Sequence, residues 1–153
     1  MLTAAFQRYP VFDSPETVGA ILRSDLLWAE TRGVDLAVFP ECYLHGHAYD
    51  HATIEQRAVR LDGREVKALL KMLAPIQVVA VIGLFERRGD EIYNSAVVIQ
   101  SGRILGVYAK AHPNEAGIAS GSVFPVFDLG GQCVGINICN DANHSASAMT
   151  PTA

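Results

Sequence analysis

The sequence has 153 residues, of which 50% are hydrophobic and 18% are charged, and its formal net charge is −4. This length suits one domain, and an acidic balance without a basic cluster argues against nucleic acid as the main partner. The longest near-continuous apolar run, 78–85, is too short to cross a bilayer. The N-terminal stretch MLTAAFQRYPVF lacks a basic segment followed by an apolar one, so we expect no signal peptide. Three cysteines without a framework spacing favour free thiols in a reducing, cytoplasmic compartment.

The first part of the chain predicts a parallel strand–helix–strand unit. We expect a short strand over 3–7, a helix over 13–33 and a buried strand over 34–41. Ser14 suits the N-cap of the helix, Pro15 its first turn and Gly33 its end. A strand, a helix and a strand in this order imply a right-handed parallel crossover.

The remaining chain predicts a loop, a helix and then an antiparallel meander. Segment 42–75 is interpreted as a loop followed by a helix over REVKALLKML, with strands next at 76–86, 91–100 and 103–110. The turns between these strands are RRGD and SG. After a loop at 114–122, two strands are expected at 123–129 and 132–139, joined through Gly130-Gly131, and NHSASAMTPTA resembles the start of another helix. About seven strands and two or three helices predict an α/β protein with a mixed sheet that is covered on both faces.

Three polar side chains follow three of the expected strands. Glu41, Lys110 and Cys139 each come after an apolar run, and ligands of open α/β sheets bind beyond the carboxyl ends of strands. A thiol acts as a nucleophile in its thiolate form, which a neighbouring carboxylate can generate and a nearby cation can stabilise. Other interpretations stay open, since Glu41 could be a solvated loop acid, Lys110 a surface lysine, and Cys139 a small buried hydrophobe.

Three linked motifs identify a family resemblance. DLAVFPECYLHGH, YNSAVVIQSGRILGVYAKAH and GINICND resemble, in order and spacing, the signatures of the nitrilase superfamily of carbon–nitrogen hydrolases. The resemblance implies a four-layer α-β-β-α sandwich in which Glu41 is the general base, Lys110 stabilises the oxyanion and Cys139 is the nucleophile. It also implies a thioester acyl-enzyme formed from a small amide, carbamoyl or nitrile substrate, with no metal or organic cofactor.

The resemblance also bears on the extent of the chain. The family domain continues well past the cysteine, so we expect residues 1–153 to be a carbon–nitrogen hydrolase domain that is truncated at its C-terminus. We further expect the full-length form to be a homo-oligomer.

Further residues are candidates around this triad. Glu115 lies between the lysine and the cysteine and is a possible auxiliary carboxylate, as many members have a second glutamate there. Asn140 and Asp141, whose backbone N–H groups follow the cysteine, are candidates for the oxyanion hole or pocket. Tyr93, Asn94 and His47 are further pocket candidates, although Tyr93 can instead pack in the sheet while Asn94 shapes its edge.

Two features have plainer interpretations. His45, His47 and His51 lie near Glu41, but a metal site needs three or four converging ligands, so a polar loop is favoured and no metal is expected. Cys42 and Cys133 are interpreted as small buried hydrophobes.

Two other classes of function remain as alternatives to the hydrolase. One is a catalytically silent fragment that associates with a partner through an exposed apolar sheet face. The other is a flavodoxin-like binding domain, which is disfavoured because no glycine-rich phosphate loop follows the first strand and residues 76–110 form a meander.

Overall fold

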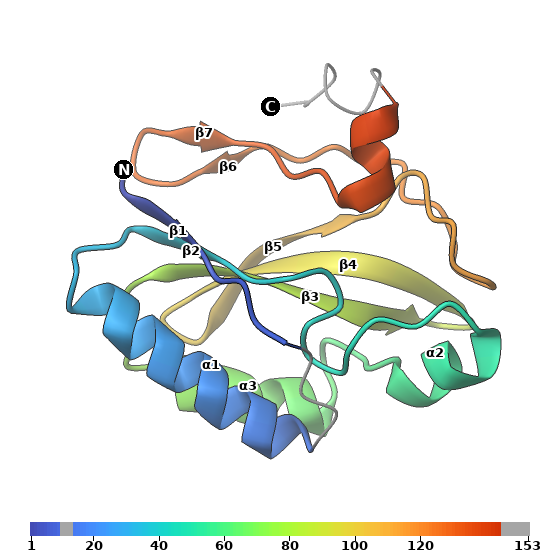
Figure 1. Cartoon of the computed structure of the whole chain (residues 1–153), viewed down its shortest axis with the longest axis horizontal. Helices are drawn as coiled ribbons and strands as arrows, with labels where there is room; N and C mark the ends of the chain where they lie inside the picture. Colours follow the sequence, from blue (N-terminus) through green and yellow to red (C-terminus); the bar gives the residue numbers. More distant parts are fainter. Residues whose placement is uncertain (10–13, 145–153) are drawn as a thin grey trace.

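The computed structural model describes residues 1–9 and 14–144 and folds them around a five-stranded sheet (Figure 1). The elements, in chain order, are β1 (Thr3–Ala5), α1 (Pro15–Glu30), β2 (Leu36–Val38), α2 (His51–Arg57), α3 (Arg64–Leu73), β3 (Val79–Arg88), β4 (Glu91–Gln100), β5 (Arg103–Ala109), β6 (Phe127–Asp128), β7 (Cys133–Val134) and the 3₁₀ helix η1 (Cys139–Asn143). None of the helices in the described ranges is long and apolar enough to cross a membrane.

The main sheet is mixed, with the strand order β1-β2-β3-β4-β5. β1, β2 and β3 are parallel, while β3, β4 and β5 form an antiparallel meander. The expected parallel crossover and the expected meander are therefore both confirmed. The β4–β5 turn places Ser101 and Gly102 at φ values of 49° and 69°, as a tight two-residue hairpin turn requires.

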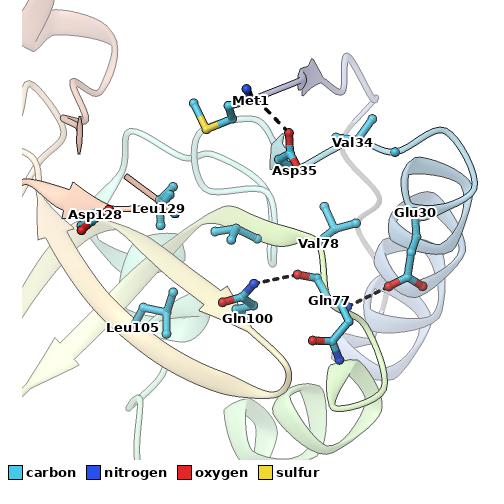
Figure 2. A pocket seen from close by; sticks show the side chains of 13 residues that line it. Met1, Glu30, Val34, Asp35, Gln77, Val78, Gln100, Leu105, Asp128 and Leu129 are labelled. Atoms are coloured by element: carbon cyan, nitrogen blue, oxygen red, sulfur yellow. Dashed lines mark hydrogen bonds and ion pairs between the residues drawn. The ribbon is translucent and has the colours of Figure 1, made fainter. Parts of the chain in front are cut away.

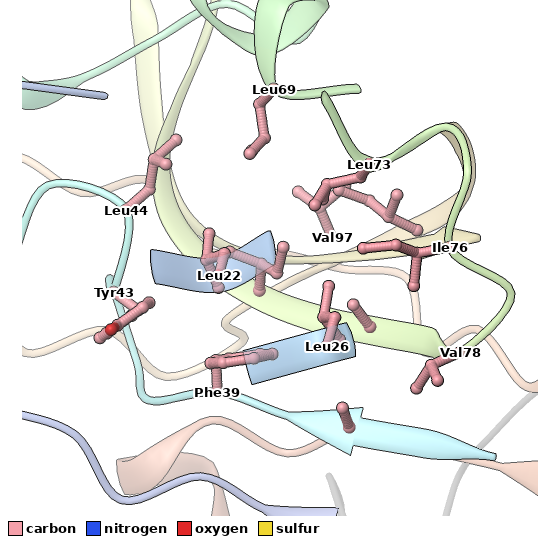
Figure 3. Close-up of a cluster of buried hydrophobic side chains, with 14 of the residues drawn as sticks. Leu22, Leu26, Phe39, Tyr43, Leu44, Leu69, Leu73, Ile76, Val78 and Val97 are labelled. Atoms are coloured by element: carbon pink, nitrogen blue, oxygen red, sulfur yellow. The ribbon is translucent and has the colours of Figure 1, made fainter. Parts of the chain in front are cut away.

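Helices α1 and α3 cover one face of this sheet (Figure 1). Ser14 caps α1 by accepting a hydrogen bond from the Thr17 N–H, as its position predicts. Leu22 and Leu26 of α1 meet Leu69 and Leu73 of α3 over the sheet (Figure 3). Each such leucine stabilises the fold by about 1.5–3 kcal/mol when it is fully buried.

The opposite face of the sheet is covered by the β6–β7 hairpin and the segment that leads into η1 (Figure 1). β6 and β7 pair antiparallel, and the turn between them contains Gly130 and Gly131, both at positive φ. Phe127 and Ile138 bury their side chains against the main sheet. The described residues thus build a helical layer, a five-stranded layer and a two-stranded layer, an α/β arrangement that agrees with the expected sandwich.

Some expected boundaries are wrong. The strands expected at 123–129 and 132–139 shorten to two residues each, and Cys139 begins a 3₁₀ helix instead of ending a strand. Pro125 lacks a donor for a strand ladder, and the Asp141 carboxylate accepts the Ile138 N–H at 3.1 Å, which favours a turn.

Three other details differ from the expectations. Helix α2 was not foreseen as a separate element, and Asp50 caps it by accepting from the Thr53 N–H at 2.9 Å. β3 runs to Arg88, so the turn expected over 87–90 is shorter. Cys42 is buried as expected, but Cys133 is exposed, because β7 lies at the surface of the small hairpin. The helix expected from 143 onward lies largely outside the described residues.

A glycine in β3 lets the segment after β2 lie directly on the sheet. A Cβ added at Gly83 would lie 2.4 Å from the Cys42 N and 2.7 Å from the Pro40 O. The same crossing is held by hydrogen bonds from Phe39 N to Val81 O at 3.0 Å and from Leu44 N to Gly83 O at 3.1 Å. The position of Glu41 over β3 therefore depends on the missing side chain at Gly83.

We expect Gly83→Ala to lower the free energy of unfolding by about 1–3 kcal/mol, because backbone atoms must move to admit the methyl group. Gly19→Ala is the matched control, since its new Cβ would meet only side-chain atoms at 3.4 Å or more, and helix propensity favours alanine by up to about 1 kcal/mol. Urea unfolding of both variants measures the difference. Equal midpoints for Gly83→Ala and the parent chain would contradict the close contact.

Candidate active site

Glu41 lies in the sharp turn that follows β2. Cys42, the next residue, has a φ of 50°, which is uncommon for a residue other than glycine and turns the chain over β3. The Glu41 side chain is 21% exposed, so solvent can reach its carboxylate. The turn fixes the backbone from which this side chain extends.

Lys110 follows β5, which ends at the same end of the sheet as β2. Its backbone N–H donates to Asn94 O at 2.8 Å, and its side chain is 1% exposed. The Nζ atom lies 2.7 Å from Glu41 Oε1 and 2.9 Å from Glu115 Oε1. Burial opposes the charged form of Lys110, but the hydrogen bonds to both glutamates outweigh it and raise the pKa of Lys110.

Glu115 is the most deeply buried acid of this cluster. Its Oε1 atom accepts hydrogen bonds from Lys110 Nζ and, at 2.8 Å, from Asn94 Nδ2. The same oxygen faces His47 Nε2 at 3.0 Å. Its Oε2 atom accepts the Asn114 N–H at 2.9 Å. Burial by itself would raise the pKa of Glu115, but the hydrogen bond from Lys110, a backbone donor and His47 lower it to about 2. Glu115, the possible auxiliary carboxylate, and His47, a pocket candidate, thus lie beside Glu41 and Lys110.

Asn94, for which the sequence left open a pocket role or a role in shaping the edge of its strand, is a member of this cluster. Its Nδ2 donates to Glu41 Oε1 at 2.7 Å as well as to Glu115, and its Oδ1 accepts from Cys42 Sγ at 3.4 Å. The side chain is fully buried. The available signal was strand alternation, because Asn94 is a polar residue on the face of β4 that also carries the buried Ala96 and Val98.

Cys139 lies at the start of η1 and shares a pocket with Glu41 and Asn94. It is exposed and has a φ of 43°, a strained backbone conformation of a kind that gathers at functional sites. The pocket has a volume of about 180 Å³. Its lining is mostly apolar and consists of Val38, Phe39, Pro40, Glu41, Val81, Gly83, Asn94, Ala96, Ile136, Asn137, Ile138 and Cys139.

Asp141 anchors the turn that carries Cys139. Its carboxylate accepts from Tyr108 Oη at 2.7 Å and from the His112 N–H at 2.8 Å, and it is fully buried. Burial and this hydrogen bond raise the pKa of Tyr108. Asn140 adds a hydrogen bond from its Nδ2 to His112 O at 2.9 Å. Neither Asn140 nor Asp141 lines the pocket, and both tie η1 to the segment around Lys110.

Tyr93, also expected near the site, lies on the opposite face of β4 from Asn94. Its hydroxyl donates to Glu91 Oε2 at 2.6 Å, and the Arg88 guanidinium lies 4.5 Å from the centre of its ring. Successive side chains of a strand point to opposite faces, so Tyr93 and Asn94 cannot both face Glu41.

The same cluster contains the one group of potential metal ligands found within residues 1–9 and 14–144. Glu41, His47 and Glu115 offer ligand atoms within 4.8 Å of one another. However, the Lys110 ammonium already lies within 2.9 Å of both carboxylates and supplies the positive charge there. His45 instead faces Glu65, at 3.6 Å, so the three loop histidines do not converge.

A larger pocket, of about 400 Å³, lies at the other end of the sheet (Figure 2). Met1, Asp35, Gln77, Gln100 and Asp128 are among the residues around it (Figure 2). None of Glu41, Lys110 and Cys139 lines this pocket. The smaller pocket is therefore the one that combines a carboxylate and a thiol.

The chain is similar to known proteins along most of its length. The family model for carbon–nitrogen hydrolases matches residues 2–152, and the chain belongs to this family. The chain is similar to a nitrilase of Pyrococcus abyssi, at 31% identity over 134 residues, covering 80% of this chain and 49% of the relative. It is also similar to an (R)-stereoselective amidase of a Pseudomonas species, at 34% identity over 110 residues, covering 70% of this chain and 40% of the relative.

A solved structure shares the fold. The glutamine-dependent NAD⁺ synthetase of Acinetobacter baumannii matches with a TM-score of 0.80 and 23% identity, over 95% of this chain and 29% of that chain. Together these matches establish the carbon–nitrogen hydrolase fold for this α/β chain. The chain spans about half, or less, of the length of these relatives.

The burial of Glu115 predicts a specific acid sensitivity. Its pKa falls from 4.5 to about 2 on folding, so the stability that its charged form contributes is present above pH 4.5 and is lost as the pH falls toward 2. We expect Glu115→Gln to lower the free energy of unfolding at pH 7 by roughly 2 kcal/mol or more, because hydrogen bonds to a charged group are lost. The stability of the variant should also depend less on pH between 4.5 and 2, as urea unfolding at several pH values measures.

Asp90→Asn is the matched control, since it removes an exposed carboxylate from the β3–β4 turn. It should leave both the stability at pH 7 and the acid dependence close to those of the parent chain. An unchanged acid dependence in Glu115→Gln would contradict the charged, buried state of Glu115.

Proposed function

We propose that this chain carries the catalytic residues of a hydrolase of non-peptide carbon–nitrogen bonds, acting on a small amide, carbamoyl or nitrile substrate. Glu41 is the general base, Lys110 stabilises the oxyanion and Cys139 is the nucleophile. The observation that carries the proposal is that Glu41, hydrogen-bonded to Lys110 at 2.7 Å, lines the same pocket as the exposed Cys139. Membership of the carbon–nitrogen hydrolase family adds independent support.

For an amide, the reaction divides into two steps. In the first, the Cys139 thiol passes its proton to the Glu41 carboxylate as the sulfur attacks the carbonyl carbon, and the carbonyl oxygen becomes an oxyanion. When the tetrahedral intermediate collapses, the C–N bond breaks, Glu41 returns the proton to the leaving nitrogen, and a thioester remains on Cys139. In the second, water gives a proton to Glu41 and attacks the thioester, which releases the acid and restores the thiol.

Lys110 is suited to the oxyanion role. An ammonium group has three N–H donors, and within the described residues two of them are directed at Glu41 and Glu115. The third can meet an oxyanion in a buried setting, where electrostatic stabilisation is strongest. The backbone N–H of Asn140, the residue that follows the nucleophile, is the additional donor that we propose. The Asp141 N–H, expected to share this role, instead donates to Ile138 O at 3.0 Å.

We extend the proposal to the whole protein. Residues 1–153 are proposed to form the N-terminal part of a carbon–nitrogen hydrolase domain, and the full-length form is proposed to be a homo-oligomer. The match covers 49% and 40% of the length of two relatives, which supports the proposal that the domain is longer than this chain. A cytoplasmic location is supported by the three cysteines, all of which are free thiols. No metal or organic cofactor takes part in the proposed reaction.

Alkylation by iodoacetamide near neutral pH tests the proposal on the chain itself. Cys139 should react about tenfold faster than Cys133, which is also exposed but lies in β7, because a thiol with a base at hand has more thiolate character. Cys42 should stay unlabelled in the folded chain, since burial and the neighbouring glutamates raise its pKa. Mass spectrometry of labelled peptides gives the three rates.

Release of ammonia from short aliphatic amides such as propionamide tests turnover. Cys139→Ala should abolish the release, and Cys133→Ala should leave it unchanged. Labelling of Cys139 no faster than Cys133, together with no ammonia release, would overturn the proposal and leave the catalytically silent association module as the better description.

A further inference from the structure

Two donors converge on one oxygen of Glu41. Lys110 Nζ and Asn94 Nδ2 each lie 2.7 Å from Glu41 Oε1. Among residues 1–9 and 14–144, no hydrogen bond is made to Glu41 Oε2. Oε1 is therefore held by two donors of the protein, while Oε2 is left for chemistry in the pocket that Cys139 lines.

The orientation of the Asn94 amide is fixed by its surroundings. Its two N–H bonds are directed at Glu41 Oε1 and at Glu115 Oε1, which lies 2.8 Å away. Its Oδ1 accepts from Cys42 Sγ at 3.4 Å. A flipped amide would turn its oxygen toward two carboxylate oxygens and lose both hydrogen bonds, so the observed orientation is the favourable one.

The thiol of Cys42 supports this orientation because it retains its proton. Burial, together with the charges of Glu41 and Glu115, raises the pKa of Cys42. A protonated thiol can donate, weakly, to an amide oxygen. Cys42 follows Glu41 directly in the chain, so the turn that places the carboxylate also places the group that orients Asn94.

We infer that Asn94 is a positioning residue, which holds Glu41 Oε1 together with Lys110 and thereby presents Glu41 Oε2 to the Cys139 thiol. This inference rests on the proposed function. It goes beyond the Glu41, Lys110 and Cys139 triad by assigning a role to a residue that takes no part in the bond changes.

The choice of a neutral donor matters for the charge of the site. Glu41 and Glu115 bring two negative charges and Lys110 one positive charge, so these three groups keep a net negative charge. A second cation at position 94 would cancel that charge and make Glu41 a poorer base, because nearby positive charge favours the carboxylate over its protonated form. An amide supplies the hydrogen bonds and adds no charge.

Asn94→Leu tests the role, because leucine has a similar branched shape but cannot donate. The readout is the rate of Cys139 alkylation divided by the rate of Cys133 alkylation in the same molecule, measured from pH 5 to pH 9. At neutral pH we expect this ratio to fall by about tenfold, since a base that is free to rotate is poorly aligned with the thiol. The acid limb of its pH profile should also move to higher pH, since a donor to the charged carboxylate is lost.

Gln100→Ala is the matched control, because it removes another amide from β4 at the far end of the strand. It should leave the ratio and its pH profile unchanged. If circular dichroism shows that Asn94→Leu does not fold, Asn94→Ala replaces it and should lower the ratio in the same direction.

The outcomes of this experiment distinguish the positioning role of Asn94 from the proposed function. A parent ratio near one overturns the proposed function, and the positioning role with it. A high parent ratio that persists in the Asn94 variants, with an unmoved acid limb, overturns the positioning role and leaves the proposed function standing. A lower ratio with a shifted acid limb supports both.

Discussion

The site depends on one interaction, the bridge that the Lys110 ammonium makes between Glu41 and Glu115. The Glu41 and Glu115 carboxylates have oxygens within 4.8 Å of each other. They would repel each other strongly without a cation between them. Lys110 places that cation 2.7 Å and 2.9 Å from their oxygens, and Asn94 reinforces the arrangement from the next strand. Removing one charged member of such a buried ion pair is expected to lower the free energy of unfolding by about 3–5 kcal/mol. The bridge therefore stabilises the fold and assembles the chemistry.

The polarity of the strands explains why these groups meet. Glu41 follows β2, Lys110 follows β5 and Asn94 lies near the start of the antiparallel β4, so all three reach the same edge of one sheet. β5 also holds the thiol segment in place, because Tyr108 donates to the Asp141 carboxylate at 2.7 Å. Lys110 and Tyr108, the donor that holds Asp141, are thus two residues apart in the chain. The pocket lies between the turn after β2 and the segment 136–139.

Much of this arrangement could be predicted from the sequence, because it depends on local patterns. The crossover, the meander and the placement of Glu41 and Lys110 at strand ends follow from apolar periodicity and turn residues. The conformation around Cys139 could not be predicted, since the Asp141 carboxylate competes with the strand ladder only once Tyr108 and His112 have reached it. Tyr93 and Asn94 show a related limit. The motif marked their neighbourhood, but only the register of β4 decides which of the two faces Glu41.

The central claim is that Glu41 acts as the base for Cys139 across their shared pocket. Its most direct test is the ratio of Cys139 to Cys133 alkylation in the parent chain and in Glu41→Gln, which keeps the shape of the side chain but removes the proton acceptor. The account predicts a ratio of about ten in the parent and close to one in the variant, because the two exposed thiols then differ little in thiolate content. A ratio that stays high in Glu41→Gln would contradict it.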